Sequence, residues 1–391
     1  MVDGKTGVAK DAGGIARARE LVKQGIDLME HDGYKEAAAS LDKAISLLEG
    51  GKAGPEELIR TYVAVSRLNL FTRNLDKCEA FALKAVDQMK KQGVGPSAKG
   101  EAMNAYGAAL AWKGERTSAL ANLERALSFF EAAKDEWGVA RACRNIGTVH
   151  LFRSLFAKSL AYYNRASKIF EELRKEEEMW SILVNIALSK GLQGLYSDAI
   201  KDYERIVVHC NKEGRGRLVA TSHTNMGYFY QKMGELDKAM EHYEESSRLY
   251  GTMEVKGPDF FNIIGKADVL IAKGDMEAAD KLLRNHIEAL MASSSDDIIG
   301  RVQRTSGLIS IARGDLKRAE EHFAKAEERL SAAVNEVVRA QVYIDWASAR
   351  LRAGNGKGAT QMFDKAREIF SRLRLPLLER ELDIVIKKGA G

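Results

Sequence analysis

Three asparagines recur at a fixed spacing in the middle of this 391-residue chain, and their amides could bind the backbone of another polypeptide. Asn145, Asn185 and Asn225 stand 40 residues apart, within the segments RNIG, VNIA and TNMG. An asparagine amide carries a donor and an acceptor, so one side chain can bridge the N–H and C=O groups of an extended peptide. The spacing predicts a row of peptide-binding amides if the fold places the three residues side by side.

Two pairs of arginines form a second recurring pattern. Arg141 with Arg144, and Arg301 with Arg304, are each three residues apart, so both members of a pair share one face of a helix. Guanidinium groups in such an arrangement can pair with the carboxylates of an acidic partner. They are equally compatible with ordinary solvated charge, and the sequence leaves both interpretations open.

Residue patterns typical of enzymes are missing from the sequence. The seven histidines are scattered without an HExxH spacing, and no GxSxG motif is present. The segment GNGKGAT, at residues 354–360, lacks the GxxxxGK[ST] spacing of a phosphate-binding loop. We therefore predict a non-catalytic protein that needs neither a metal nor another cofactor.

Composition narrows the class of protein further. The net charge is only +5, and acidic and basic residues alternate along helical segments, which argues against a nucleic-acid partner. No run approaches 18 apolar residues, so membrane insertion is not expected, and the first residues lack a secretory signal. Three cysteines without a CxxC spacing favour a reducing, cytoplasmic location.

A repeat of 40 or 41 residues organises most of the chain. Each unit has two small residues twelve positions apart, such as Gly227 and Ala239, within amphipathic helical patterns. A glycine inside a helix costs about 1 kcal/mol relative to alanine, so a closely approaching second helix is the natural explanation. A bulky residue follows the second small residue by four positions in every unit except the one with Ala82. The small residues are Gly25/Ala37, Ser66/Cys78, Gly107/Ala119, Gly147/Ser159, Ala187/Ala199, Gly227/Ala239, Ala267/Ala279, Gly307/Ala319 and Ala347/Ala359.

The few prolines support the same division into units. Pro55, Pro96, Pro258 and Pro376 all fall at junctions between units, where a proline does not interrupt a helix. No alternating strand pattern is evident, so the sequence predicts an all-α protein.

The repeat resembles the tetratricopeptide repeat (TPR). The resemblance lies in the paired small residues, the aromatic that follows them, the turns GELDKA and GDLKRA, and the stem NMGYFY. The long unit is similar to repeats of kinesin light chains, spindle-orienting adaptors and the sensor arms of bacterial regulators. It implies a right-handed α-solenoid of about nine helix-turn-helix units with a C-terminal capping helix. We expect a flexible N-terminus at 1–13, a superhelix over 14–375, and the capping helix and tail at 376–391.

The resemblance also implies where a ligand binds. First helices of TPR units line a concave groove, and asparagine ladders are a feature of peptide-binding long-unit relatives. Asn145, Asn185 and Asn225 are thus expected in the groove, with the four arginines on the same face. The alternative is that these amides only line a hydrated groove or bond to neighbouring helices.

Three functions fit this prediction. The first is a cytoplasmic adaptor that holds a peptide or helix of a partner protein in the groove. The second is a peptide-responsive regulator; since only about 17 residues precede the first unit, its effector is expected to be a separate protein. The third is a structural subunit that assembles with itself. The sequence identifies neither the partner nor the oligomeric state.

Overall fold

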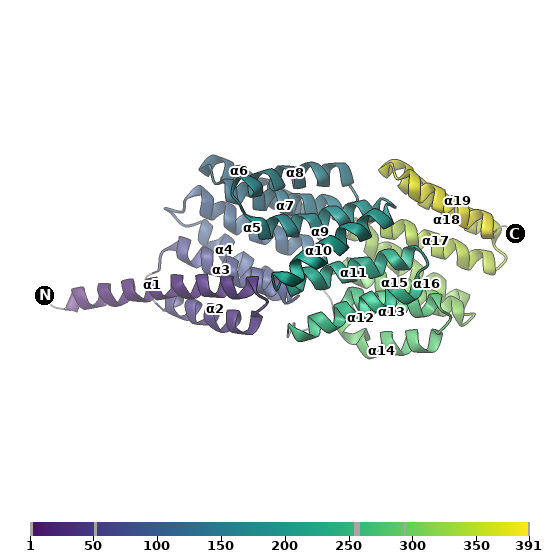
Figure 1. Ribbon diagram of the computed structural model, residues 1–391, viewed down its shortest axis with the longest axis horizontal. Helices are drawn as coiled ribbons and strands as arrows, with labels where there is room; N and C mark the ends of the chain where they lie inside the picture. The colour runs from purple at the N-terminus through teal and green to yellow at the C-terminus, as the bar shows by residue number, and fades with distance from the viewer. Residues whose placement is uncertain (1–2, 51–52, 254–258, 293–294, 390–391) are drawn as a thin grey trace.

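The computed structural model describes residues 3–50, 53–253, 259–292 and 295–389, and this part of the chain contains nineteen α-helices and no strand (Figure 1). The first ten helices are α1 (Asp3–Glu30), α2 (Tyr34–Glu49), α3 (Pro55–Phe71), α4 (Leu75–Met89), α5 (Pro96–Lys113), α6 (Arg116–Ala133), α7 (Glu136–Phe152), α8 (Phe156–Glu172), α9 (Glu176–Leu192) and α10 (Tyr196–Lys212). The others are α11 (Gly216–Lys232), α12 (Leu236–Thr252), α13 (Phe260–Ala272), α14 (Met276–Met291), α15 (Asp296–Ala312), α16 (Leu316–Ala332), α17 (Glu336–Arg352), α18 (Gly356–Leu373) and α19 (Pro376–Gly389). The predicted all-α fold is confirmed.

Each odd-numbered helix from α1 to α17 pairs with the next helix, which gives nine hairpins in the described residues, and the small residues lie where the two helices meet. A Cβ on Gly147 would lie 2.7 Å from the ring of Tyr163, and a Cβ on Gly107 would lie 2.6 Å from Leu123. These bulky side chains are the ones that the repeat places four residues after the second small residue. The missing side chain therefore makes room for the partner helix, as predicted.

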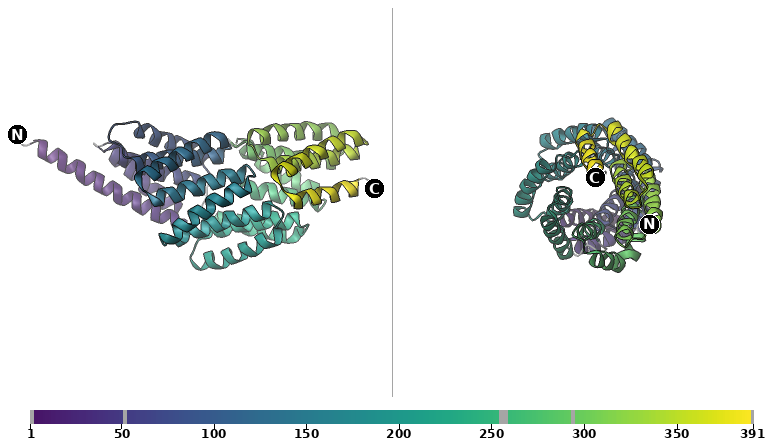
Figure 2. Two further views of the ribbon diagram at one scale, coloured as in Figure 1. Left: turned by 90° about the horizontal axis from the view of Figure 1, so that it is seen from above. Right: turned by 90° about the vertical axis from the view of Figure 1, so that its right-hand side faces the viewer.

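The odd-numbered helices form the inner row of the solenoid. Each of them contacts the next odd-numbered helix, whereas successive even-numbered helices make no comparable contact in the described residues. In a curved array the inner elements are closer together, so the even-numbered helices lie outside. Seen along the long axis, the helices wind around a common centre (Figure 2).

The boundaries of the units follow the prolines. Pro55, Pro96 and Pro376 begin α3, α5 and α19, where the missing N–H of proline would have no partner within the helix; Pro258 lies outside the described residues. At the N-terminus, α1 begins at Asp3 and projects beyond the helix that pairs with it (Figure 2). The flexible segment expected at 1–13 stays a prediction.

The turn inside each hairpin contains a residue in the left-handed conformation. Glycine occupies this position in six units, for example Gly114 and Gly194, whereas Asp32, Arg73 and Ser154 occupy it in the first, second and fourth units. A left-handed conformation costs a residue with a side chain roughly 1–2 kcal/mol, so these three side chains are retained against a local preference for glycine.

The turns inside the hairpins also connect one coil of the superhelix with the next coil, by contacts that we call edge contacts. In the first five units, the turn of unit n lies against the start of the first helix of unit n+5. Asp32 accepts a hydrogen bond from the backbone N–H of Arg217 at 3.1 Å, and Arg73 pairs with Asp259 at 2.8 Å, just before α13. The third turn follows the same rule, because a Cβ on Gly114 would lie 3.9 Å from the backbone nitrogen of Asp296.

The fourth and fifth units continue this pairing rule. The buried apolar cluster around the fourth turn, with Leu151 and Phe156, also contains Ala340 of α17. A Cβ on Gly194 would lie 2.9 Å from Leu377 of the capping helix α19. In the last four units the turn glycines have no other atom within 4 Å of a Cβ position; these are Gly234, Gly274, Gly314 and Gly354. The edge contacts thus end where the chain supplies no unit n+5.

Filling the space where the two helices of a hairpin meet (the hairpin seam) should destabilise the protein. A Cβ on Gly227 would lie 2.9 Å from the Tyr243 ring and 3.1 Å from the carbonyl oxygen of Ala239. We expect Gly227→Val to lower the free energy of unfolding by about 1–3 kcal/mol, measured by urea denaturation. The control is Gly251→Ala near the end of α12, where no atom lies within 4 Å and stability should rise by at most about 1 kcal/mol. An equal midpoint for both variants would contradict the close-packed seam.

Candidate functional site

Two of the three repeated asparagines are held by hydrogen bonds within the protein. Asn145 on α7 donates to the side-chain oxygen of Asn104 on α5, at 3.0 Å. Asn225 on α11 donates to the hydroxyl of Tyr203, at 2.9 Å, and this hydroxyl donates in turn to the carbonyl oxygen of Val184. These contacts fix the direction of both amides and link neighbouring units.

Asn185 on α9 differs from the other two asparagines. It is half-buried on the inner row, and its amide makes no hydrogen bond to any other described residue. Since α9 lies between α7 and α11 and contacts both, Asn185 stands between two amides of fixed orientation. It is therefore the member of the row whose donor and acceptor are both available to a ligand.

The first predicted arginine pair connects adjacent inner helices. Arg141 pairs with Glu101 of α5 at 3.0 Å, and Arg144 pairs with Glu178 of α9. Burial alone would raise the pKa of Glu178, but Arg144, Arg67, Arg141 and Arg217 together hold that pKa below its usual value. Glu178 is thus a carboxylate surrounded by several cations.

In the second arginine pair, one member forms ion pairs with two carboxylates instead of one. Arg304 bridges Asp268 of α13 and Asp345 of α17, each at 2.6 Å. Burial opposes its charge, but the two carboxylates raise the pKa of Arg304. Arg301 pairs with Asp297 at 3.3 Å and lies over the ring of Phe261. The structure gives Arg304 a role between three units, so contact of this pair with a ligand stays a prediction.

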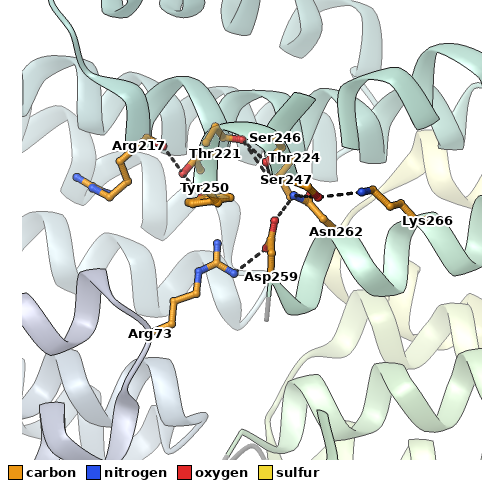
Figure 3. A network of polar contacts seen from close by, with 11 residues as sticks. Arg73, Arg217, Thr221, Thr224, Ser246, Ser247, Tyr250, Asp259, Asn262 and Lys266 are labelled. Atoms are coloured by element: carbon orange, nitrogen blue, oxygen red, sulfur yellow. Dashed lines mark hydrogen bonds and ion pairs between the residues drawn. The ribbon is translucent and has the colours of Figure 1, made fainter. Parts of the chain in front are cut away.

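A polar network surrounds the edge contact of Arg73 (Figure 3). The Arg73 guanidinium lies 4.6 Å from the ring centre of Tyr250, whose hydroxyl is 3.0 Å from Thr221 Oγ1. Asp259 also accepts a hydrogen bond from Asn262, which begins a chain of contacts through Ser247 to Lys266. The network joins the turn between α3 and α4 to α11, α12 and α13. We call Arg73, Asp259 and Tyr250 the clasp.

Two histidines pair between α11 and α12. The Nδ1 atoms of His223 and His242 are 2.9 Å apart, so one ring must donate and the other accept. Burial and the neighbouring His242 lower the pKa of His223 to about 4, and burial also lowers the pKa of His242. Both rings are therefore neutral in the folded protein near pH 7.

Sequence reasoning missed several residues of this region. Asn104 was not recognised as a partner of Asn145 because it lies one position out of phase with the asparagine row. Tyr203 was recognised only as a bulky packing residue, although its hydroxyl also orients Asn225. Arg67, Arg217, Arg73 and Asp259 carry no periodic signal. Tyr250 does, since it is in phase with Phe130 and Phe170, but that phase indicates only a packing residue. Among the described residues, no group of three metal-ligating side chains is found, and no helix could span a membrane.

Comparison with known families identifies the chain. The family model described as the MalT-like TPR region matches residues 100–375. This match covers more than half of the sequence, so the chain belongs to the MalT-like TPR family. The predicted TPR resemblance is thereby confirmed. A search of curated proteins found no significant match.

Solved structures of similar fold extend over nearly the whole chain. A Rap protein complexed with competence and sporulation factor is 13% identical, with a TM-score of 0.71 over 92% of this chain and 99% of its own. NprR in complex with its cognate peptide NprX is 16% identical, with a TM-score of 0.61 over 90% of this chain and 99% of its own. The apo form of NprR from B. thuringiensis is 17% identical, with a TM-score of 0.53 over 90% and 98%. At these identities the comparison establishes the shared helical solenoid.

Breaking the clasp should destabilise and expand the molecule. Asp259→Ala leaves Arg73 without its carboxylate, and we expect a loss of about 2 kcal/mol, between the values for exposed and buried pairs. Small-angle X-ray scattering should show a larger radius of gyration. In a double-mutant cycle, Asp259→Ala should cost much less in an Arg73→Ala background.

The exposed pair between Lys273 and Asp237 provides a control for the clasp. Asp237→Ala should cost less than about 1 kcal/mol and leave the radius of gyration unchanged. Equal effects of Asp237→Ala and Asp259→Ala would show that the edge contact is no stronger than a surface pair.

The histidine pair predicts a loss of stability in acid. Because the folded-state pKa of His223, about 4, lies below the unfolded value of about 6.5, the unfolded chain binds protons first as pH falls. Stability should therefore be complete above about pH 6.5 and decrease as pH falls towards about 4. His223→Gln should reduce this slope in denaturation curves recorded from pH 7 to pH 4. A residual slope is expected from buried His150, whose pKa is also lowered to about 4. An unchanged slope would contradict the assignment to His223.

Proposed function

We propose that this chain is a non-catalytic, cytoplasmic scaffold that binds a partner peptide along its inner row of helices. The observation that carries the proposal is the available amide of Asn185, placed between the fixed amides of Asn145 and Asn225. An extended peptide rises about 3.3 Å per residue, and neighbouring helices pack roughly 10 Å apart, so such a peptide would meet one inner helix about every third residue.

Proteins of similar fold support a peptide ligand. The Rap protein of similar fold is complexed with competence and sporulation factor, and NprR of similar fold is in complex with its cognate peptide NprX. The three cysteines are free and buried, which suits a reducing compartment.

The edge contacts favour a regulatory form of this function. A peptide that spans α7, α9 and α11 would alter the angle between units, and the altered angle would change the distance between unit n and unit n+5. The bound peptide could thus control the shape presented to a separate effector protein. Self-assembly is the remaining alternative, and light scattering at several protein concentrations distinguishes it from a monomeric regulator.

Asn185 provides the sharpest test of peptide binding. We expect Asn185→Ala to weaken binding to an array of random heptapeptides about tenfold or more, because a ligand amide would lose its partner. The melting temperature should stay unchanged, since the side chain has no internal hydrogen bond to lose. The matched control is Asn122→Ala, which removes an amide bonded only to the Ser118 carbonyl on outer helix α6. Equal binding by both variants would remove Asn185 from the site.

A further inference from the structure

Two arginines from distant units meet at one aromatic ring. The guanidinium carbon of Arg217, at the start of α11, lies 4.2 Å from the ring centre of Phe71, and that of Arg67 on α3 lies 5.2 Å from it. The first edge contact brings them together, because Asp32 holds the backbone N–H of Arg217. An aromatic ring orients a guanidinium group that packs on it and leaves the N–H donors, which lie in the plane of the guanidinium group, available.

Neither guanidinium group is neutralised by a partner. Within the described residues, Arg67 and Arg217 make no side-chain hydrogen bond and no ion pair, and Figure 3 shows the Arg217 side chain directed away from the clasp network. Two of the nearby carboxylates are already engaged: Glu178 binds Arg144, and the two oxygens of Asp32 accept the Tyr34 hydroxyl and the Arg217 backbone N–H. The two arginines therefore retain donors for an additional anion.

The surroundings concentrate positive charge at this point. Burial lowers the pKa of Arg67, and the like charges of Arg141, Arg144 and Arg217 lower it further, against the opposing effect of Glu178. The small cavity between Arg67 and Arg217 is also lined by Arg215 and by two acidic residues, Glu30 and Asp32, so three cations face two carboxylates there. A further carboxylate would balance the remaining positive charge, so this site is arranged to gain free energy from a bound anion.

We propose that Arg67 and Arg217 bind a carboxylate of the peptide ligand, so that the protein selects acidic peptides. This inference rests on the proposed peptide-binding function and specifies its ligand class. The charges of Arg67 and Arg217 both act on Glu178, which precedes Asn185 by seven residues on α9. Seven helical residues span about 10 Å, which is about three residues of an extended peptide. A heptapeptide is therefore long enough to contact Asn185 and to continue along α9 towards the end of the helix where Glu178 lies.

The test compares synthetic heptapeptide libraries that differ in one group. The central residue is fixed as glutamate or glutamine, the other positions are random but exclude aspartate and glutamate, and each library is made with a free or an amidated C-terminus. We expect the library with a carboxylate to bind the wild-type chain about tenfold or more tightly than the amidated glutamine library, which lacks one. Preference for the central glutamate identifies a side-chain carboxylate, and preference for the free acid identifies the C-terminus.

Variants connect this preference to the two arginines. The double variant Arg67→Gln/Arg217→Gln should lose the preference for a carboxylate and still bind the amidated glutamine library. Arg67→Lys keeps the charge but loses the planar pair of donors, and should reduce the preference only partly. The control is Arg125→Gln, an exposed arginine of α6, which should change nothing. Melting temperatures confirm that every variant is folded.

The outcomes separate this inference from the proposed function. Binding that depends on Asn185 but shows no preference for a carboxylate would overturn the acidic ligand class and leave peptide binding intact. A preference that survives in the double variant would also overturn it. If no library binds the wild-type chain, both the acidic ligand class and the peptide-binding function are wrong.

Discussion

The contact between the turn of unit n and the first helix of unit n+5 determines the shape of the whole molecule. Neighbouring hairpins alone leave a solenoid free to change its pitch, because each unit touches only the next. Here the hairpin turns of the first five units make additional contacts: Asp32 and Arg73 supply polar contacts, and Gly194 allows close approach of Leu377. At the first two of these turns, the residue in the left-handed conformation makes the contact with its own side chain.

The same closure arranges the candidate site. It brings Arg217 of the sixth unit to Phe71 of the second, residues that no nearest-neighbour contact would join. The inner row then presents two kinds of polar group, amides oriented by the protein itself and guanidinium groups without a counter-ion. Arg304, with a carboxylate on each side, shows how fully this chain pairs an arginine when its role is internal. Among the described residues, Arg67 and Arg217 have no such paired carboxylates, and this difference is the reason for assigning them to a ligand.

Much of the fold could be predicted from the sequence, because hairpin packing is local and repeats. The small residues Gly147 and Ser159 predict, within a single unit, where its two helices meet, and the proline positions predict boundaries between units. The edge contacts could not be predicted in this way, because they depend on a small rotation per unit that accumulates over five units. For the site, phase placed Asn185 on the first helix of its unit, and in the structure this residue is half-buried on α9. Phase could not show that Asn145 and Asn225 are bound internally, since Asn104 lies off the repeat and Tyr203 serves two purposes.

The pairing of Arg73 with Asp259 also restricts how this gene can evolve. Most repeat arrays gain or lose whole modules by duplication and deletion with little harm, because every junction is equivalent. In this chain, removing one module between the second and the seventh would place Arg73 opposite the wrong junction and leave both charges unmatched. The number of modules between these two residues is therefore fixed by the geometry of the pair, whereas an addition after the last module would leave Arg73 opposite Asp259.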